Sequence, residues 1–185
     1  MKKVLLVLML IFLTGFNAVF ADAGWENPKS IRTYIEPNDK KMMMKQAFAK
    51  WTQLTNGKIV FKYVTSPDDA QIKVKFVKDA SKDMKNLEQA IGVTHATFAV
   101  LPSRKVVLNT ATIEIADHAP GSTGKLMLKD RIFRVMVHEI GHAIGFLGTH
   151  AHSSDRQSIM FPAAVSRNQD VTQNDLNFLA KLYGW

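Results

Sequence analysis

The chain is 185 residues long, carries a formal net charge of +8, and contains 46% hydrophobic residues and no cysteine. This length allows one domain with a full hydrophobic core and is too short for two. The absence of cysteine excludes disulfides, a lipoprotein anchor and thiolate ligands to zinc. The basic excess is spread along the chain, so it indicates a solvated surface rather than a nucleic-acid-binding site.

The N-terminus has the pattern of a signal peptide. Two lysines follow Met1, residues 4–16 are mostly apolar, and small residues suited to cleavage lie at Ala21 and Ala23. The apolar run is too short to be a spanning helix, and no later stretch could be one. We therefore expect residues 1–21 to be removed. The remainder, residues 22–185, is expected to be one secreted or periplasmic domain, monomeric and without a stable membrane anchor.

Residues 30–54 predict a strand followed by a helix. Alternating apolar positions in residues 30–36 are typical of a strand. A Pro-Asn-Asp turn follows, in which Asn38 or Asp39 can cap the next helix. Residues 40–54 carry apolar side chains at helical spacing, and we interpret the methionines there as part of the core rather than as a metal site.

Alternation and turn signals predict four more strands in the middle of the chain. Their expected ranges are 59–64, 70–77, 93–101 and 106–108. Within the second of these, the apolar positions face inward and the lysines face water. The charged residues 78–89, and residues 117–124 with their proline and glycines, are expected to form surface loops.

The second half of the chain predicts two helices separated by an irregular segment. A helix with apolar flanks is expected at residues 125–146, and an irregular stretch at residues 147–170. Thr172 and Asp175 can form a capping box at the start of the last helix, and Gly184 marks its end. Together these elements predict an α+β fold, with a twisted mixed sheet of about five strands and a first, a central and a C-terminal helix.

The motif His138-Glu139-Ile140-Gly141-His142 lies in the predicted central helix. At 3.6 residues per turn the two histidines share one face, so their imidazoles can hold one small cation. Glu139 lies about 100° round the helix, where its carboxylate can reach a water on that cation without becoming a ligand. Such a motif also arises by chance on polar helices. Here the flanking residues are apolar nearly all round, and buried histidines need partners, so the pattern favours zinc.

Over nearly the whole of residues 22–185 the chain resembles a matrixin-type metzincin, a family of zinc endopeptidases. The similarity covers the first helix, the strand at residues 70–76, the histidine motif and the segment 159–162, which resembles the Met-turn of that family. The resemblance implies a metzincin-like fold. It also implies that an extended substrate lies along the strand around residues 94–98 by β-augmentation.

The resemblance further implies roles for individual residues. His138 and His142 match the two zinc ligands on the helix, and Glu139 matches the general base. Gly145 matches the glycine that bends the chain toward a third histidine. Met160 matches the methionine that forms an apolar floor beneath the metal without binding it.

The third zinc ligand departs from the family pattern, which places a histidine where this chain has Gly148. Counting forward from Gly145 favours His150. Counting back from Met160 favours His152, because the third histidine of matrixins lies eight residues before the Met-turn methionine. The segment between ligand and floor has a fixed span, whereas an insertion after the helix closes a longer loop at small entropic cost. We therefore predict His152 as the third ligand, with His150 as the alternative.

Two further departures concern a second metal and latency. The structural metal site of the family uses several loop histidines and an aspartate, and only His95 has a matching position. We therefore expect one catalytic zinc and no structural zinc or calcium, and interpret His95 and His118 as ordinary polar residues. The usual animal members carry a pro-segment whose cysteine blocks the zinc. This chain has no cysteine and little sequence before its first strand, so we expect activity once the signal is removed.

These features predict a secreted zinc-dependent metalloendopeptidase acting on protein or peptide substrates. Three imidazoles leave one position on zinc open for water, and Glu139 can accept the proton of that water as it attacks a peptide carbonyl. The alternative is an exported zinc-binding or interaction protein that keeps the fold without turnover. The extra residues between Gly145 and His152 could produce that outcome by altering the ligand geometry.

Overall fold

The computed structural model describes residues 23–78, 91–116, 118, 127–162 and 169–185. Its elements are β1 (Ile31–Ile35), α1 (Lys41–Leu54), β2 (Phe61–Tyr63), β3 (Ile72–Val77), β4 (Gly92–Val100), β5 (Val106–Ala116), α2 (Lys129–Ala143), α3 (Gln173–Tyr183), and the short 3-10 helices η1 (Pro28–Ser30), η2 (Pro67–Asp69) and η3 (Gly148–His150). The expected signal peptide and most of the two expected surface loops lie outside the described residues. Within them, no helix is both long and apolar enough to cross a membrane.

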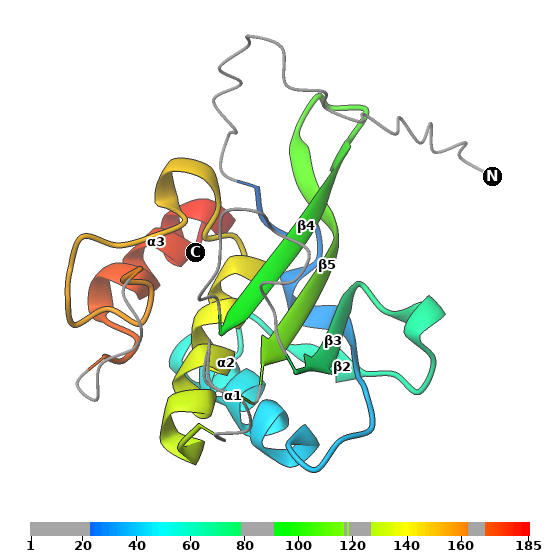
Figure 1. The fold of residues 1–185 in the computed structure, drawn as a ribbon. Helices are drawn as coiled ribbons and strands as arrows, with labels where there is room; N and C mark the ends of the chain where they lie inside the picture. The colour runs from blue at the N-terminus through cyan, green and yellow to red at the C-terminus, as the bar shows by residue number, and fades with distance from the viewer. Residues whose placement is uncertain (1–22, 79–90, 117, 119–126, 163–168) are drawn as a thin grey trace, which may run out of the picture.

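The five strands form one sheet in the order β2-β1-β3-β5-β4 (Figure 1). The first four of these strands run parallel to one another, and β4 pairs antiparallel with β5. Among the described residues, β4 has a neighbouring strand on one side only, so it is an edge strand of the sheet. A mixed sheet of five strands with three α-helices confirms the fold class predicted from the sequence.

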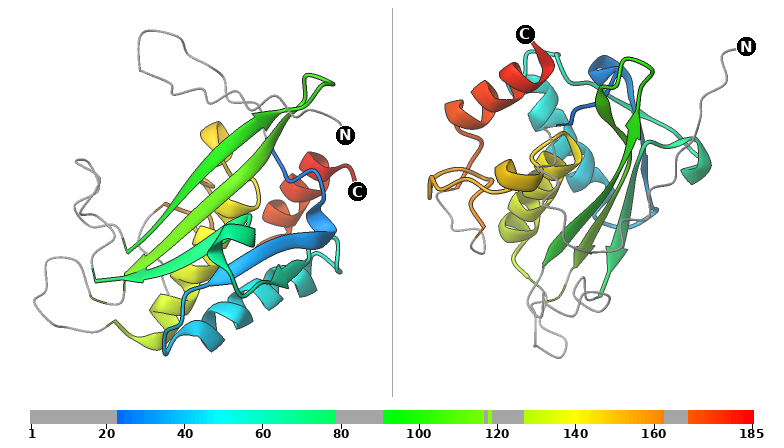
Figure 2. Two further views of the ribbon diagram at one scale, coloured as in Figure 1. Left: turned by 90° about the vertical axis from the view of Figure 1, so that its right-hand side faces the viewer. Right: turned by 90° about the horizontal axis from the view of Figure 1, so that it is seen from above.

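The three α-helices lie on the same face of the sheet, as the two views in Figure 2 show. Between the two layers is the core, to which β1 contributes Ile31 and Ile35 and α1 contributes Phe48 and Trp51. The indole Nε1 of Trp51 donates a hydrogen bond to the carbonyl oxygen of Val137 at 2.9 Å. α2 is thus fixed between α1 on one side and the strands β4 and β5 on the other.

The predicted bounds of three elements were wrong. β5 continues to Ala116 instead of ending at residue 108, because it pairs with β3 on one side and β4 on the other, and this long-range pairing leaves no local signal. β2 is shorter than the predicted 59–64. α2 begins at Lys129 rather than at residue 125, because Leu128 is extended and forms its N-cap. The helix ends at Ala143, three residues before the predicted end, and the chain then turns through Gly145, whose φ is 125°.

The predicted helix caps had mixed outcomes. The N-cap of α1 is Lys40, whose side chain makes no capping hydrogen bond, so the prediction of Asn38 or Asp39 as the cap was wrong. The Asn38 side chain instead accepts the N–H of Lys40 at 2.9 Å and stabilises the turn. The capping box of Thr172 and Asp175 at the start of α3 is confirmed.

The first and last described segments meet at the end of α2. The indole Nε1 of Trp25 donates to the carbonyl oxygen of Ala143 at 2.9 Å, and the Tyr183 hydroxyl donates to that of Ile144 at 2.8 Å. The main-chain N–H of Trp25 in turn donates to the Tyr183 oxygen at 3.2 Å. The bonds to Ala143 and Ile144 satisfy carbonyl groups that the end of a helix leaves without a partner. They also hold the turn that follows the histidine motif.

Candidate metal centre

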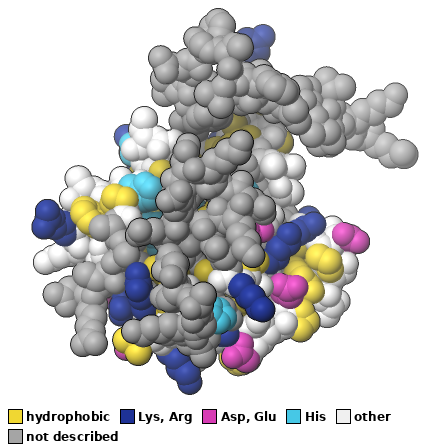
Figure 3. Space-filling model, in the orientation of Figure 1, with side chains coloured by type: hydrophobic (Ala, Val, Ile, Leu, Met, Phe, Trp, Pro, Cys, Tyr) yellow, Lys and Arg dark blue, Asp and Glu magenta, His cyan; other side chains and the backbone are white. Residues whose placement is uncertain are grey.

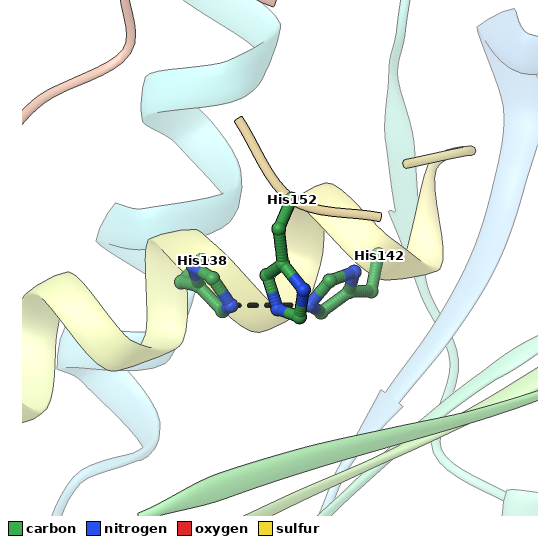
Figure 4. A group of neighbouring side chains, drawn as sticks. All are labelled: His138, His142 and His152. Atoms are coloured by element: carbon green, nitrogen blue, oxygen red, sulfur yellow. Dashed lines mark hydrogen bonds between the residues drawn. The ribbon is translucent and has the colours of Figure 1, made fainter. Parts of the chain in front are cut away.

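The last part of α2 carries the histidine motif. His138 and His142 lie one helical turn apart, and their rings extend into the same space beside the helix (Figure 4). Their Nε2 atoms are 3.0 Å apart. Val137, Ile140 and Ala143 on other faces of the helix are buried in the core. The two rings therefore project from a support that packing holds in place.

Main-chain carbonyl groups orient both rings. Nδ1 of His138 lies 2.6 Å from the carbonyl oxygen of Ile159, and Nδ1 of His142 lies 2.8 Å from that of Phe146. Because a carbonyl only accepts, each Nδ1 carries the hydrogen and each Nε2 has a lone pair. Burial lowers the pKa of His138 to about 4 and that of His142 to about 3, so both rings are neutral near pH 7.

His152 completes the group from the segment that follows α2. Its ring centroid lies 5.6 Å from that of His138 and 5.2 Å from that of His142. One nitrogen from each of the three rings lies within 4.8 Å of the others. Two lone pairs that face each other at 3.0 Å repel unless a cation attracts both, and neutral imidazole nitrogens are common zinc ligands. This donor set therefore fits a zinc ion.

His150 lies apart from this group. It belongs to η3, and its ring centroid is 5.1 Å from that of Phe178 in α3. The N–H of Ser153 donates to the carbonyl oxygen of Met160 at 2.9 Å, which ties the segment carrying His152 to the one carrying the methionine. The structure thus brings His152 to the motif and leaves out His150, the alternative considered from the sequence.

Met160 is fully buried against α2. A Cβ atom on Gly141 would overlap the Met160 sulfur, so the glycine of the motif leaves the space that this side chain fills. The Ser158 hydroxyl accepts the N–H of Met160 at 2.9 Å and donates to Oδ1 of Asp175 at 2.8 Å. The turn containing Met160 is therefore packed under α2 and anchored to α3.

Glu139 projects from α2 toward the edge strand β4, and the residue is 5% exposed. Oγ1 of Thr94 lies 2.7 Å from Oε2 of the carboxylate and 3.0 Å from the main-chain oxygen of Glu139. Burial raises the pKa of Glu139 to about 7, and the Thr94 hydrogen bond opposes that rise. A carboxyl group with a pKa near neutrality can both take up and release a proton.

Sequence reasoning missed several contacts that shape the site. It did not find that Thr94 and Gly92 of β4 meet Glu139, where a Cβ atom on Gly92 would lie 2.6 Å from the Glu139 Cγ. It recognised Asp175 only as a capping residue and did not pair it with Ser158. A single glycine or hydroxyl residue follows no spacing rule, so only the position of Asp175 in a capping box gave any signal.

Histidine side chains reach the surface on the face shown in Figure 3, and His152 is exposed. Among the described residues, the three-histidine group is the one set of at least three histidine or carboxylate side chains close enough to hold a metal. His95 is exposed on β4, and alternation along the strand directs it away from the face that carries Thr94. Neither His95 nor His118 belongs to the three-histidine group.

A family model described as Matrixin (Peptidase_M10) matches residues 26–184 of the chain. The chain belongs to the matrixin family. This matrixin is 31% identical over 150 residues to Metalloendoproteinase 1 of Glycine max, covering 78% of this chain and 45% of that protein. It is 26% identical over 153 residues to Metalloendoproteinase 1-MMP of Arabidopsis thaliana, covering 82% and 40%. The chain thus spans less than half the length of these curated relatives.

Among solved structures, the matrixin chain is similar to myroilysin, with a TM-score of 0.55 and 17% sequence identity. The alignment covers 87% of this chain and 82% of that one. At this identity the similarity concerns the fold. The family predicted from the histidine motif and the Met-turn segment is confirmed by the family match, and the fold is confirmed by the sheet and helices described above.

Proposed function

We propose that this matrixin is an exported zinc-dependent metalloendopeptidase that hydrolyses peptide bonds in proteins or peptides. The observation that carries the proposal is the juxtaposition of three imidazoles, those of His138, His142 and His152, with the buried carboxyl group of Glu139. A closed structural zinc site has four protein ligands and no need of a carboxylate beside them. The names of the plant relatives, both metalloendoproteinases, also support an enzyme.

The three histidines would hold the zinc ion through ring nitrogens. When bound, zinc supplies Lewis-acid chemistry, which lowers the pKa of a water molecule and polarises a carbonyl group. The carbonyl groups of Phe146 and Ile159 keep the Nε2 lone pairs of His142 and His138 directed toward the site and make these nitrogens more basic.

Glu139 carries out the proton transfers. Its carboxylate accepts a proton from water while the water oxygen forms a bond to the peptide carbonyl carbon. The protonated side chain then gives this proton to the nitrogen of the breaking C–N bond. An amine and a carboxylic acid are the products, and Glu139 returns to the carboxylate. The burial that brings its pKa close to 7 suits a group that must act in both directions.

The free edge of β4 is the proposed position of an extended substrate. An edge strand directs main-chain donors and acceptors away from the sheet, and a peptide can pair with such groups as an additional strand. Because Thr94 of this strand contacts Glu139, a peptide paired there lies beside the base. This arrangement supports cleavage within a chain.

Export is proposed on the basis of the sequence. The lysines after Met1, the apolar residues 4–16 and the small residues near position 21 support removal of residues 1–21, with residues 22–185 as the mature domain. A site built from imidazoles also contains no thiol that an oxidising compartment could convert to a disulfide.

The proposal is tested by cleavage of fluorescently labelled casein with zinc-loaded and with chelator-treated protein. The substitution Glu139→Gln is expected to lower cleavage by about 10²–10⁴-fold while zinc affinity is retained, because it removes the base and leaves the ligands intact. Glu26→Gln, on an exposed residue near the start of the described chain, is the matched control. Tight zinc binding by the parent protein without any cleavage would contradict the proposal and support the non-catalytic zinc-binding alternative.

A further inference from the structure

We propose that Thr94 of the edge strand β4 is a positioning residue that holds the general base, Glu139, in its working position. The inference rests on the proposed function, in which Glu139 moves protons. It assigns a role to a side chain that lies outside α2 and outside the three-histidine group. Zinc binding and placement of the base would then depend on different parts of the chain.

The hydroxyl group of Thr94 makes two close contacts with Glu139. Its Oγ1 lies 2.7 Å from the carboxylate Oε2, within the range of a strong hydrogen bond to a charged acceptor, and 3.0 Å from the Glu139 main-chain oxygen. The carboxyl group is almost completely shielded from water, which strengthens such a bond. Among the described residues, Thr94 makes the only hydrogen bond to this carboxyl group.

This contact assigns different tasks to the two carboxylate oxygens. The Thr94 hydroxyl donates to Oε2, so Oε1 is the oxygen left to accept and release the proton of the reaction. Oε2 stays an acceptor in both states of Glu139, because the proton taken up resides on Oε1. The same hydrogen bond can therefore hold the carboxyl group before and after proton transfer.

Gly92 complements Thr94 on the same face of β4, because alternate residues of a strand point the same way. A Cβ atom on Gly92 would lie 2.6 Å from Cγ and 2.7 Å from Oε1 of Glu139. Only a residue without a side chain leaves that space free. β4 thus presents a gap at Gly92 and a hydroxyl group at Thr94 to one glutamate, and together they confine its conformation.

Loss of the hydroxyl should slow the chemical step and leave substrate binding intact. The zinc ligands and the free edge of β4 do not involve the Thr94 side chain. A base displaced by a fraction of an ångström to an ångström lowers the rate of reaction by up to about 100-fold. The effect is therefore expected in kcat rather than in KM.

The test measures kcat and KM on a fluorogenic peptide that contains a bond which the parent protein cleaves in casein. Thr94→Val, which keeps the shape of the side chain and removes the hydroxyl, should lower kcat by about 10–100-fold with KM within about twofold. Thr94→Ser, which keeps the hydroxyl, should retain kcat within about threefold of the parent. Zinc affinity should be unchanged in both variants.

Two further variants separate positioning from general effects on folding. Thr33→Val removes another buried hydroxyl, from β1, and is expected to leave kcat unchanged. Gly92→Ala keeps the Thr94 hydroxyl and displaces the Glu139 carboxyl group, so it should lower kcat even if Thr94→Val does not fold. Crystal structures of parent and Thr94→Val, with zinc, provide a readout independent of turnover. In Thr94→Val the Glu139 carboxyl group should lie in a different position from the one it has in the parent.

The outcomes distinguish this inference from the proposed function. If the parent cleaves peptides and Thr94→Val retains parental kcat, or Thr94→Ser loses as much activity as Thr94→Val, the inference is overturned and the function stands. If the parent shows no chelator-sensitive cleavage, the proposed function fails. The crystal structures then decide alone, and an unmoved Glu139 carboxyl group in Thr94→Val overturns the inference.

Discussion

The two sides of the metal site are held in different ways. One side is formed by the segment after α2, residues 144–162. Main-chain carbonyl groups of Phe146 and Ile159 in this segment orient two histidine rings, and the hydrogen bond from Ser158 to Asp175 ties the segment to α3. On the side of β4, one hydroxyl group meets the carboxylate of Glu139. Main-chain contacts survive most substitutions, whereas a hydroxyl is lost with one. Zinc affinity and turnover should therefore respond to different mutations.

The largest effect on the first side is expected from the third histidine. Bound zinc contributes about 10–16 kcal/mol in four-ligand protein sites, so removal of one of three imidazoles should weaken zinc binding by about a thousandfold or more. We expect His152→Ala to do so in zinc titrations. His150→Ala is the matched control and should bind zinc as tightly as the parent, because its ring lies against Phe178. The reverse result would assign the ligand to His150.

The two sides should also respond oppositely to pH in the metal-free protein. The lowered pKa values of His138 and His142 give stability that is present above pH 6.5 and is lost as the pH falls toward about 4 and 3. The pKa of Glu139 is raised from 4.5 to about 7, so its burial is least costly below pH 4.5 and costs progressively more as the pH rises to 7.

Glu139→Gln isolates the second of these effects. The quantity to compare is the free energy of unfolding of the variant minus that of the parent, both chelator-treated. This difference should increase by about 3 kcal/mol between pH 4 and pH 8. Chemical denaturation of parent and variant at several pH values measures the difference. A gain that does not change with pH would show that the Glu139 carboxyl group titrates in the folded protein as it does in the unfolded chain.

A smaller effect is expected where the turn that contains Met160 joins α3. Ser158→Ala removes a fully buried hydroxyl and leaves both the N–H of Met160 and a carboxylate oxygen of Asp175 without this partner. The free energy of unfolding should fall by about 1–3 kcal/mol. Ser66→Ala, which removes an exposed hydrogen bond at the N-cap of the three-residue helix η2, should change it by less than about 0.5 kcal/mol in the same denaturation experiment. Equal effects of the two substitutions would contradict a structural role for the Ser158 anchor.

The parts of the fold that could be predicted are those with a local period. The apolar spacing of α1 and α2 and the alternation in β1 and β3 follow from which side chains meet the core. β5 was predicted for only its first three residues. Its remaining part is a strand because β3 and β4 lie on either side of it. The β3 partners are 39 positions away in the sequence, and so distant a partner does not affect the local pattern.

The same distinction applies at the site. The positions of His138, Glu139 and His142 follow from the geometry of one helix turn, and that of His152 from a fixed span to Met160. Thr94 is separated from Glu139 by 45 positions, and no sequence pattern near Thr94 predicts the contact. The direction of β4 across α2 is a property of the assembled sheet. Residues that support a motif from another element therefore have to be found in the structure.

The anchoring of the Met160 turn to α3 has a consequence for biosynthesis. The His138 ring depends on the carbonyl of Ile159, and the turn that carries this carbonyl depends on Asp175, in the last helix described. A nascent chain that has not yet produced α3 has all three histidines and Glu139 but lacks the support that arranges them. The proposed hydrolytic activity would then arise only when α3 docks, so an incomplete chain would not cleave neighbouring chains during synthesis.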